Sequence, residues 1–238
     1  MIHTQQLAYT YPGGSPITFP NVDVPQGTVL LLSGPSGCGK STWLALIAAL
    51  VAPGAGTITV AEQALGALKN IAADAWRAKN IGFLPQKLHL SAALTVQQNL
   101  GVVYWAAGLP EDRARIQAAL AALGVDDLAG RLPSQLSGGQ AQRVALARAV
   151  LLSPRVILAD EPTASLDDAA AADAVALLLR TAHEQGATLV IATHDARVAT
   201  LIPLKNNGQI GFQPLNLLRK QLSKSEQFGF VDSSGVAA

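Results

Sequence analysis

A glycine-rich segment carries the clearest chemistry in the chain. It fits the pattern G-x-x-x-x-G-K-[S/T], with the fixed positions held by Gly34, Gly39, Lys40 and Ser41. In such a segment the backbone N–H groups cradle an anion, the lysine reaches the β- and γ-phosphates of a nucleotide, and the serine hydroxyl holds Mg²⁺. The pattern therefore predicts a nucleotide-phosphate site made of Gly34, Pro35, Ser36, Gly37, Cys38, Gly39, Lys40, Ser41 and Thr42.

The elements on either side of this segment agree with a phosphate site. Residues 28–33 form a short apolar run typical of a buried parallel strand, and residues 42–51 are long enough for a helix. A loop at a strand-to-helix turn adds the positive end of the helix dipole to its backbone N–H groups. The alternative is a glycine-rich turn with an exposed lysine, which the flanking strand and helix disfavour.

Other polar residues stand where apolar strands end. One continuous apolar run ends in Asp160 and Glu161, and two further predicted strands end at Gln86 and His194. Ligands of open α/β sheets bind at this carboxyl edge. We therefore expect Ser41, Gln86 and Asp160 to hold Mg²⁺. Glu161 is the expected base for the water that attacks the γ-phosphate, and His194 the expected hydrogen-bond partner of that phosphate. Taken singly, each of these residues is more often part of an ordinary loop.

Two further features could contact a nucleotide. A Leu-Ser-Gly-Gly-Gln segment opens an amphipathic helix, and its Ser137, Gly138, Gly139 and Gln140 offer a helix cap with open backbone N–H groups. It lacks a lysine, so another element must complete it as an anion site, and a plain helix cap is the alternative. Tyr11, on an extended segment, offers a ring on which an adenine base could stack, with simple packing as the alternative.

The order of the predicted elements indicates an α/β fold. Two or three β-type runs within residues 2–32, separated by proline and glycine turns, predict an N-terminal antiparallel flap. Residues 87–152 are rich in alanine and leucine and predict an inserted helical subdomain. We therefore expect one domain over residues 1–212, with a phosphate-loop (RecA-like) core and a mainly parallel sheet formed by residues 1–86 and 153–212.

The predicted subdomain and the end of the chain have their own expected elements. Three helices are expected in the helical subdomain, over residues 94–107, 111–123 and 138–152. A closing hairpin is expected over residues 202–212, turning at Asn207 and Gly208. Residues 213–238 are expected to be a tail with one amphipathic helix from residue 215 to 224 and no assigned role.

Composition limits the classes of function. The chain has 238 residues, of which 14% are charged, and a net charge of +1, so no basic excess favours nucleic-acid binding. Its longest apolar run, residues 43–53, is about half of a membrane span, and no leader pattern opens it, so we expect a soluble protein that stays where it is made. The single cysteine, Cys38, suits a reducing compartment, and its alkylation is expected to fill the phosphate cradle and abolish nucleotide binding.

Together these motifs resemble those of the ATP-binding-cassette ATPases, the nucleotide-binding subunits of ABC transporters. The resemblance spans residues 1 to about 212, and its most specific element is the five-residue signature segment. The positions that match the family's pattern are the adenine-stacking aromatic at Tyr11, the Walker A loop at residues 34–42, the Q-loop glutamine at Gln86, the signature at residues 136–140, the Walker B aspartate and general base at Asp160 and Glu161, the D-loop at residues 165–167 and the switch histidine at His194.

The resemblance also implies partners. In the family two cassettes pair head to tail, so Ser137, Gly138 and Gly139 of one subunit would complete the γ-phosphate site built on Lys40 of the other. ATP would close the pair and hydrolysis would open it. The motion would pass to integral membrane permease subunits docked near Gln86 and the helical subdomain, which implies a location at the cytoplasmic face of the inner membrane. A periplasmic adaptor is a further implied partner.

Within the family, the chain looks most like the bacterial branch that serves lipoprotein release and macrolide export. The spacing from Gly82 to Gln86 and the run over residues 94–100 support this likeness, whereas Trp43 and Pro85 depart from the usual pattern. Two other classes remain as alternatives. One is a soluble ABC-type protein acting on DNA or ribosomes, which usually carries tandem cassettes or basic insertions. The other is a phosphate-loop kinase, which the signature segment disfavours.

Overall fold

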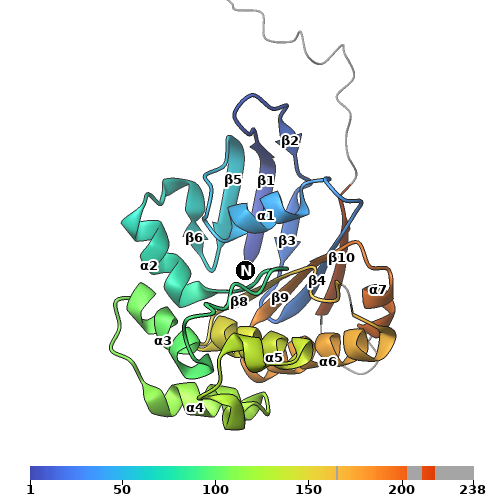
Figure 1. Cartoon of the computed structure of the whole chain (residues 1–238). Coiled ribbons are helices and arrows are strands. Elements are labelled where there is room, and N and C mark those ends of the chain that lie inside the picture. Colours follow the sequence, from blue (N-terminus) through green and yellow to red (C-terminus); the bar gives the residue numbers. More distant parts are fainter. Residues whose placement is uncertain (165, 203–210, 218–238) are drawn as a thin grey trace, which may run out of the picture.

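Two β-sheets and the helices around them form the molecule (Figure 1). The computed structural model describes residues 1–164, 166–202 and 211–217. In chain order the strands and α-helices are β1 (Ile2–Tyr9), β2 (Ile17–Thr18), β3 (Val22–Val24), β4 (Thr28–Ser33), α1 (Lys40–Ile47), β5 (Ala55–Val60), β6 (Gln63–Ala64), α2 (Ile71–Asn80), β7 (Ile81–Leu84), α3 (Val96–Ala106), α4 (Arg113–Ala122), α5 (Gly138–Val150), β8 (Val156–Asp160), α6 (Asp168–Glu184), β9 (Thr188–Thr193), α7 (Arg197–Leu201) and β10 (Gly211–Asn216).

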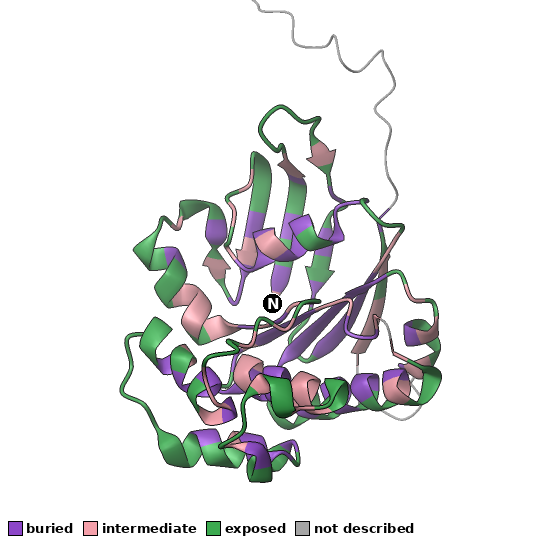
Figure 2. Ribbon diagram, in the orientation of Figure 1, coloured by how far each residue is buried: buried purple, intermediate pink, exposed green. Residues whose placement is uncertain are grey.

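The parallel sheet is the centre of the fold. Its strand order is β10-β4-β9-β8-β7, and every neighbouring pair is parallel. Alternate residues of β4 bury opposite faces: Leu30 and Leu32 pack in one core cluster with Trp43 of α1, whereas Val29 and Leu31 pack in another with helices α3 to α6. A sheet covered on both faces needs strands with apolar residues on both sides, and the sequences of β4, β8 and β9 are apolar except at their ends. These strands are buried along almost their whole length (Figure 2).

The antiparallel sheet contains the first two runs of the predicted N-terminal flap and adds β5 and β6, whereas the third run, residues 28–33, is strand β4 of the parallel sheet. The order of the antiparallel sheet is β2-β1-β5-β6, with β3 also paired to β1. Helix α1 lies between this sheet and the parallel one, because its side chains share a core cluster with residues of both. The structure therefore confirms the expected fold class, a phosphate-loop α/β core with an antiparallel flap and a helical subdomain.

Capping residues set the start of each helix in the helical subdomain. Thr95 and Ser137 form capping boxes at the starts of α3 and α5, and Asp112 caps α4. The three helices pack together and bury Tyr104 and Ile116 among other apolar residues. They lie within the three ranges expected from the sequence.

The end of the chain differs from expectation. The Asn-Gly turn and the first arm of the predicted hairpin after Ile202 lie outside the described residues. The described part of its expected second arm, Gly211 and Phe212, belongs to β10, which runs parallel to β4 and continues to Asn216, past the predicted domain boundary. Leu215 and Asn216 are therefore strand residues, and the rest of the predicted tail helix lies almost wholly outside the description. Helix α1 is also shorter than predicted. Within the described ranges, no helix is both long and apolar enough to cross a membrane.

Candidate active site

The phosphate loop joins β4 to α1 in a tight curl. Gly34, Gly37 and Gly39 have φ angles of +151°, +76° and +103°, which side-chain-bearing residues rarely adopt. At Gly34 a Cβ atom would lie 2.5 Å from the carbonyl oxygen of Leu217, so only glycine fits there. Gly39 is the N-cap residue of α1, and no side chain in the described part of the chain caps this helix. Its first backbone N–H groups therefore face the loop, as an anion site requires.

Lys40 lies inside this curl. Its Nζ donates hydrogen bonds to the carbonyl oxygens of Gly34 (2.8 Å) and Pro35 (3.3 Å) and lies 3.5 Å from Oε1 of Glu161. The side chain is only 6% exposed. A buried ammonium held in this way is positioned to meet an anion bound in the loop.

Ser41 and Asp160 meet beside the loop. Oγ of Ser41 donates a 2.9 Å hydrogen bond to Oδ2 of Asp160, while Oδ1 of Asp160 is buried without a hydrogen-bond partner among the described residues. Burial raises the pKa of Asp160, and the charge of Glu161 adds to this; Ser41 and Lys40 oppose it. A hydroxyl next to a carboxylate with an unsatisfied oxygen is a donor set that fits Mg²⁺, a cation that favours oxygen ligands.

Glu161 bridges β8 and β9. Its φ is +48°, and its backbone N–H donates to the carbonyl of Ala192 (2.8 Å). Oε2 accepts hydrogen bonds from Oγ1 of Thr193 (2.9 Å) and from the backbone N–H of His194 (3.3 Å), and Oε1 lies 2.9 Å from Nδ1 of His194. Burial raises the pKa of Glu161, but these bonds outweigh it and hold the pKa below the ordinary glutamate value. Glu161 is therefore ionised at neutral pH.

One cleft of about 380 Å³ brings most of the predicted site residues together. Its lining includes phosphate-loop residues, Gln86, Glu161 and His194, with Tyr11 as a further wall. The phenol oxygen of Tyr11 lies 3.0 Å from Oγ1 of Thr42, and its ring packs edge-on against Tyr9. Tyr11 thus stands against the loop with 48% of its surface exposed, where a ring could contact a base.

The signature segment lies elsewhere. None of Ser137, Gly138, Gly139 and Gln140 lines this cleft. Oγ of Ser137 accepts from the backbone N–H of Gln140, and the side-chain oxygen of Gln140 accepts from the backbone N–H of Ser137. A Cβ added at Gly138 or Gly139 would meet nothing within 4 Å, so this helix end is open to its surroundings. Within one subunit the segment is a helix cap.

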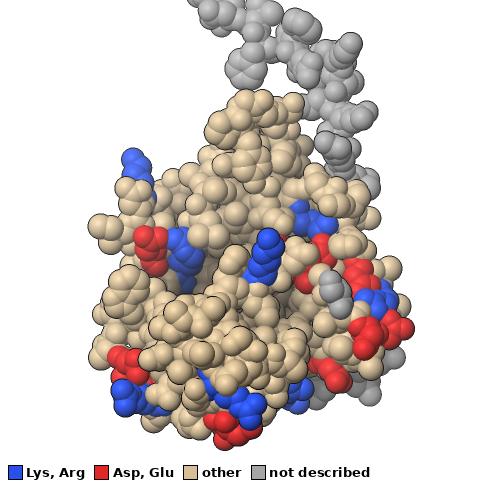
Figure 3. Space-filling view, viewed as in Figure 1, with Lys and Arg blue, Asp and Glu red and all other residues tan. Residues whose placement is uncertain are grey.

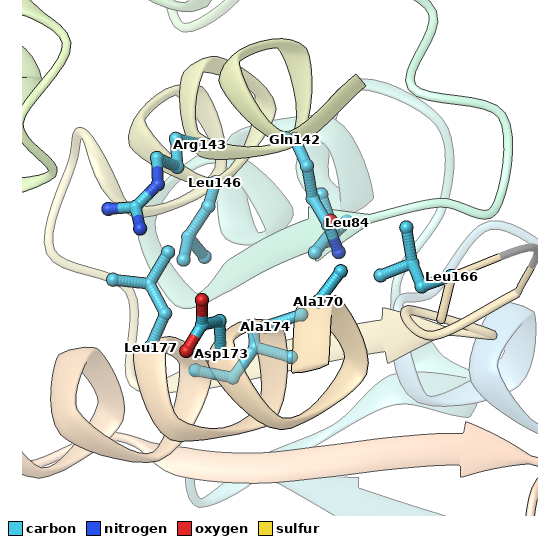
Figure 4. Close-up of a pocket in the computed structure, with 11 residues that line it drawn as sticks. Leu84, Gln142, Arg143, Leu146, Leu166, Ala170, Asp173, Ala174 and Leu177 are labelled. Carbon is cyan, nitrogen blue, oxygen red and sulfur yellow. The ribbon is translucent and has the colours of Figure 1, made fainter. Parts of the chain in front are cut away.

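Helix α5 nevertheless contacts the segment that follows β8 and Glu161. Nε2 of Gln142 donates a 2.7 Å hydrogen bond to the carbonyl of Pro162, directly after Glu161. Figure 4 shows Gln142 beside a cavity of about 130 Å³ between α5 and α6, lined mostly by Leu84, Leu146, Leu166, Ala170, Ala174 and Leu177. Gln142 therefore lines this cavity and also holds α5 to the connection that follows Glu161.

Cys38 is not where the sequence suggested. Its side chain is buried in the core cluster with Leu32 and Leu217, and it does not line the cleft. Only its backbone belongs to the loop. The expectation that a group attached to Cys38 would fill the phosphate cradle is therefore wrong, because the thiol faces the core.

Sequence reasoning missed several residues near the cleft. Thr193 bonds Glu161, and Thr163, Asp195 and Arg197 form a hydrogen-bonded group on the other side of His194. The available signal was position alone, since Thr193 and Asp195 flank a histidine at the end of a strand. Nothing in the sequence pattern distinguished Arg197 from other surface arginines.

Comparison with known proteins places these features in a family. Residues 18–164 match the family described as ABC transporter. The chain is 37% identical over 205 residues to the lipoprotein-releasing system ATP-binding protein LolD 1 of Rhodopirellula baltica, covering 84% of this chain and 90% of that one. It is 38% identical over 205 residues to the macrolide export ATP-binding/permease protein MacB 1/2 of Paracoccus denitrificans, covering 84% of this chain but only 30% of that protein.

Solved structures agree. The dimeric structure of MJ0796, described as a bacterial ABC transporter cassette, has a TM-score of 0.76 and 31% identity, covering 91% of this chain and 94% of that one. A second structure of that cassette, dimeric in a post-hydrolysis state bound to ADP and Pi, has a TM-score of 0.76 and 30% identity, covering 91% and 96%. The expected likeness to the lipoprotein-release and macrolide-export branch is confirmed. The chain belongs to the ABC transporter family, as an ATP-hydrolysing, nucleotide-binding subunit.

Proposed function

We propose that this subunit binds Mg·ATP in the cleft, hydrolyses it to ADP and phosphate together with a second copy of itself, and so drives membrane permease subunits. The supporting observation is the meeting of Lys40, Gln86, Glu161 and His194 around one cavity next to an open helix N-terminus. Lys40 and the loop N–H groups bind the phosphates, and Tyr11 stacks on the base.

The cation site is part of this proposal. Ser41, Gln86 and Asp160 hold Mg²⁺, which neutralises charge that develops on the phosphates during transfer. The buried Oδ1 of Asp160 supports the assignment, because it has no hydrogen-bond partner among the described residues and burial raises the pKa of this carboxyl group.

Glu161 acts as the base. It takes a proton from a water molecule while the water oxygen bonds to the γ-phosphorus and the bond from that phosphorus to the bridging oxygen breaks, with ADP leaving with the electron pair. The lowered pKa keeps Glu161 ionised and able to accept the proton. His194, whose side chain is 61% exposed beside Glu161 in the cleft, positions the γ-phosphate for this attack.

The second copy supplies what the cleft lacks. In one subunit the open N-terminus at Ser137, Gly138 and Gly139 faces no phosphate, because the segment does not line its own cleft. The related cassette MJ0796 is dimeric in both structures. A head-to-tail pair would bring this segment onto the γ-phosphate bound at Lys40 of the other copy.

A groove between α2, α3, β7 and α5 is the proposed docking place for the permease. It has a volume of about 580 Å³ and is lined by Phe83, Val103 and Leu152, with Trp105, 83% exposed, at its wall. The MacB relative has a permease in the same chain, by its name. An apolar groove fits a short helix of such a membrane subunit, which would hold this chain at the cytoplasmic face of the inner membrane, with a periplasmic adaptor as a further partner.

One face of the molecule lacks the kind of basic stripe that a nucleic-acid site has. On the face shown in Figure 3, basic side chains lie at the margin, mostly beside acidic ones, and one lies near the centre, and they do not merge into a stripe. A nucleic-acid site requires such a stripe.

The proposal is tested with Glu161→Gln and, as its control, Glu184→Gln at the exposed end of α6. We expect Glu161→Gln to retain ATP binding, to lose roughly 10²- to 10⁴-fold in phosphate release, and to accumulate an ATP-bound dimer in size-exclusion chromatography. Glu184→Gln should match the wild type. Wild-type turnover by Glu161→Gln removes the base assignment, and transfer of the phosphoryl group to a metabolite without phosphate release would indicate a kinase.

A further inference from the structure

A hydrogen-bonded group of side chains lies directly beside Glu161 and His194. It joins the connection between β8 and α6 to the loop after β9, two segments about thirty residues apart in the sequence. We call it the Arg197 cluster, and its members are Thr163, Asp168, Asp195, Arg197 and the backbone carbonyl of Leu166.

The carboxylate of Asp195 is the centre of this cluster. It accepts bonds from Nε of Arg197 at 3.0 and 3.1 Å and from Nη2 at 2.8 Å, and the backbone N–H of Arg197 donates to it at 3.0 Å. Its Oδ2 also accepts from Oγ1 of Thr163 at 2.8 Å. Arg197 holds the pKa of Asp195 well below its usual range, so this carboxylate is charged at neutral pH.

The remaining donors of Arg197 reach the segment that leads into α6. Nη1 bonds the carboxylate of Asp168, and Nη2 donates to the carbonyl of Leu166 at 3.3 Å. One planar guanidinium therefore holds a carboxylate after β9, a carboxylate in the first turn of α6 and a backbone carbonyl before that helix. This use of several donors in fixed directions needs arginine, because an ammonium group cannot present the same fork.

The cluster gives the catalytic loops a second connection. Thr163 is two residues after Glu161, and Asp195 directly follows His194. The bonds between Glu161 and His194 join the two loops on the cleft side, and the bond between Thr163 and Asp195 joins them again on the other side. Two points of contact restrain a rotation of one loop against the other that a single point would permit. Glu161 also has a positive φ, a strained conformation that the surrounding contacts must maintain.

The outer ion pair of the cluster, between Arg197 and Asp168, is too exposed to be mainly stabilising, whereas the side chain of Asp195 is only 16% exposed. Arg197 is 41% and Asp168 91% exposed in their side chains, and exposed ion pairs contribute little to the free energy of folding. Thr163, by contrast, is 1% exposed, so the connection between the two loops is buried where it matters for geometry. We therefore expect loss of the Arg197–Asp168 ion pair to change the free energy of unfolding little and to disturb the alignment of the two loops more.

We propose that Arg197 is a positioning residue for hydrolysis, which orients Asp195 so that Asp195 and Thr163 hold the loops of Glu161 and His194 in register. The inference rests on the proposed roles of Glu161 and His194. It assigns Arg197 no contact with ATP.

The experiment compares Arg197→Met, Arg197→Lys and Thr163→Val with two matched controls. Thr163→Ser keeps the hydroxyl, and Arg180→Met removes an arginine whose exposed partner on α6, Glu184, lies at 3.9 Å. Phosphate release is measured below the unfolding temperature of every variant. We expect Arg197→Met and Thr163→Val to lower kcat roughly 10- to 100-fold, the size of effect that a small misplacement of reacting groups produces. KM for ATP should change less than kcat. Arg197→Lys should not restore kcat, whereas Thr163→Ser should, and Arg180→Met should match the wild type.

A double mutant separates positioning from general damage. If Arg197 acts mainly by aligning Glu161, then Arg197→Met should cause a much smaller loss of turnover when Glu161 is already replaced by glutamine than it does in the wild type. Equal losses in both backgrounds, or a folded Arg197→Met with wild-type kcat, would overturn the inference. If instead Glu161→Gln alone turned over like the wild type, the proposed base would fail, whatever the Arg197 variants showed.

Discussion

Nζ of Lys40 lies 3.5 Å from Oε1 of Glu161, so the group that we assign to the phosphates and the group that we assign to the water share one corner of the cleft. The same ammonium is bonded to the carbonyls of Gly34 and Pro35. A cation fixed at this point by the loop is in place before a nucleotide arrives, and preorganised charge of this kind is efficient because it needs no rearrangement.

Lys40→Met tests this placement. A hydrogen bond to a charged group contributes about 1.5–3 kcal/mol, so we expect ATP affinity to fall roughly 10- to 100-fold while the fold is retained. Fluorescent-nucleotide titration measures the change, and Lys79→Met at an exposed position of α2 is the control. Equal affinities for the two variants would contradict the assignment.

Asp160→Asn should stabilise the nucleotide-free protein and should lower its affinity for Mg·ATP. The pKa of Asp160 is raised above the unfolded value of 3.8, so its ionised form is disfavoured in the fold at neutral pH. The neutral amide removes this penalty, and we expect a higher unfolding temperature at pH 7, with the advantage fading as the pH falls through the raised pKa.

Added Mg·ATP should make the wild type more stable than Asp160→Asn, because the wild type gains binding free energy that the variant lacks. Thermal unfolding with and without the ligand measures both effects. Asp173→Asn, at an exposed position of α6, is the control and should show neither. A variant that is less stable than the wild type without nucleotide would show that Asp160 is already satisfied in the free protein.

Glu161 should contribute stability with the opposite pH dependence. Its folded pKa is below the unfolded value of 4.5, so its contribution is fully present above that value and is lost as the pH falls through the folded pKa. We expect the difference in free energy of unfolding between wild type and Glu161→Gln to be constant above pH 7 and to shrink below about pH 4.5. Urea unfolding at several pH values measures it. A difference that grows on acidification would mean that the pKa is raised.

Much of the site follows from the sequence because parallel strands end at one edge of a sheet. The runs that end at Gln86, Asp160 and His194 are apolar throughout, so their carboxyl ends had to meet once the strands paired in parallel. The phosphate loop followed in the same way from a strand, a glycine pattern and a helix.

Other features depended on contacts that no local pattern encodes. The Asn-Gly dipeptide near the end of the chain predicted a hairpin and lies outside the described residues, whereas Gly211–Asn216 form β10, whose parallel pairing with β4 depends on tertiary packing. The direction of the Cys38 side chain depends on how the loop curls against Leu217. In the Arg197 cluster, Asp195 and Arg197 are about thirty residues from Thr163 and Asp168 in the sequence and meet them only in the fold.

Gly82→Ala should destabilise the protein through a steric clash. A Cβ atom there would lie 2.3 Å from the carbonyl oxygen of Ala149 and 2.8 Å from Cγ of Pro154, because β7 passes close to the end of α5. Overpacking of this kind costs about 1–3 kcal/mol, measurable by urea unfolding. Gly130→Ala is the control, since a Cβ there would meet nothing within 4 Å. Equal stability of the two variants would show that β7 can move away from α5 freely.

Cys38 offers a test of the loop from its buried side. The thiol is 6% exposed and packs in the core, so iodoacetamide should modify the native protein slowly and the unfolded protein fast. Because the chain has a single cysteine, intact mass reports the reaction at this one site. Adding ATP should slow the reaction further, since a ligand of the folded state lowers the population of open forms. Cys38→Ala, which cannot react, should still bind ATP, because only the backbone of this position faces the cradle. Rapid and complete modification of the folded protein would show that the thiol is accessible from the cleft, and loss of ATP binding in a folded Cys38→Ala would show that its side chain contributes to the phosphate site.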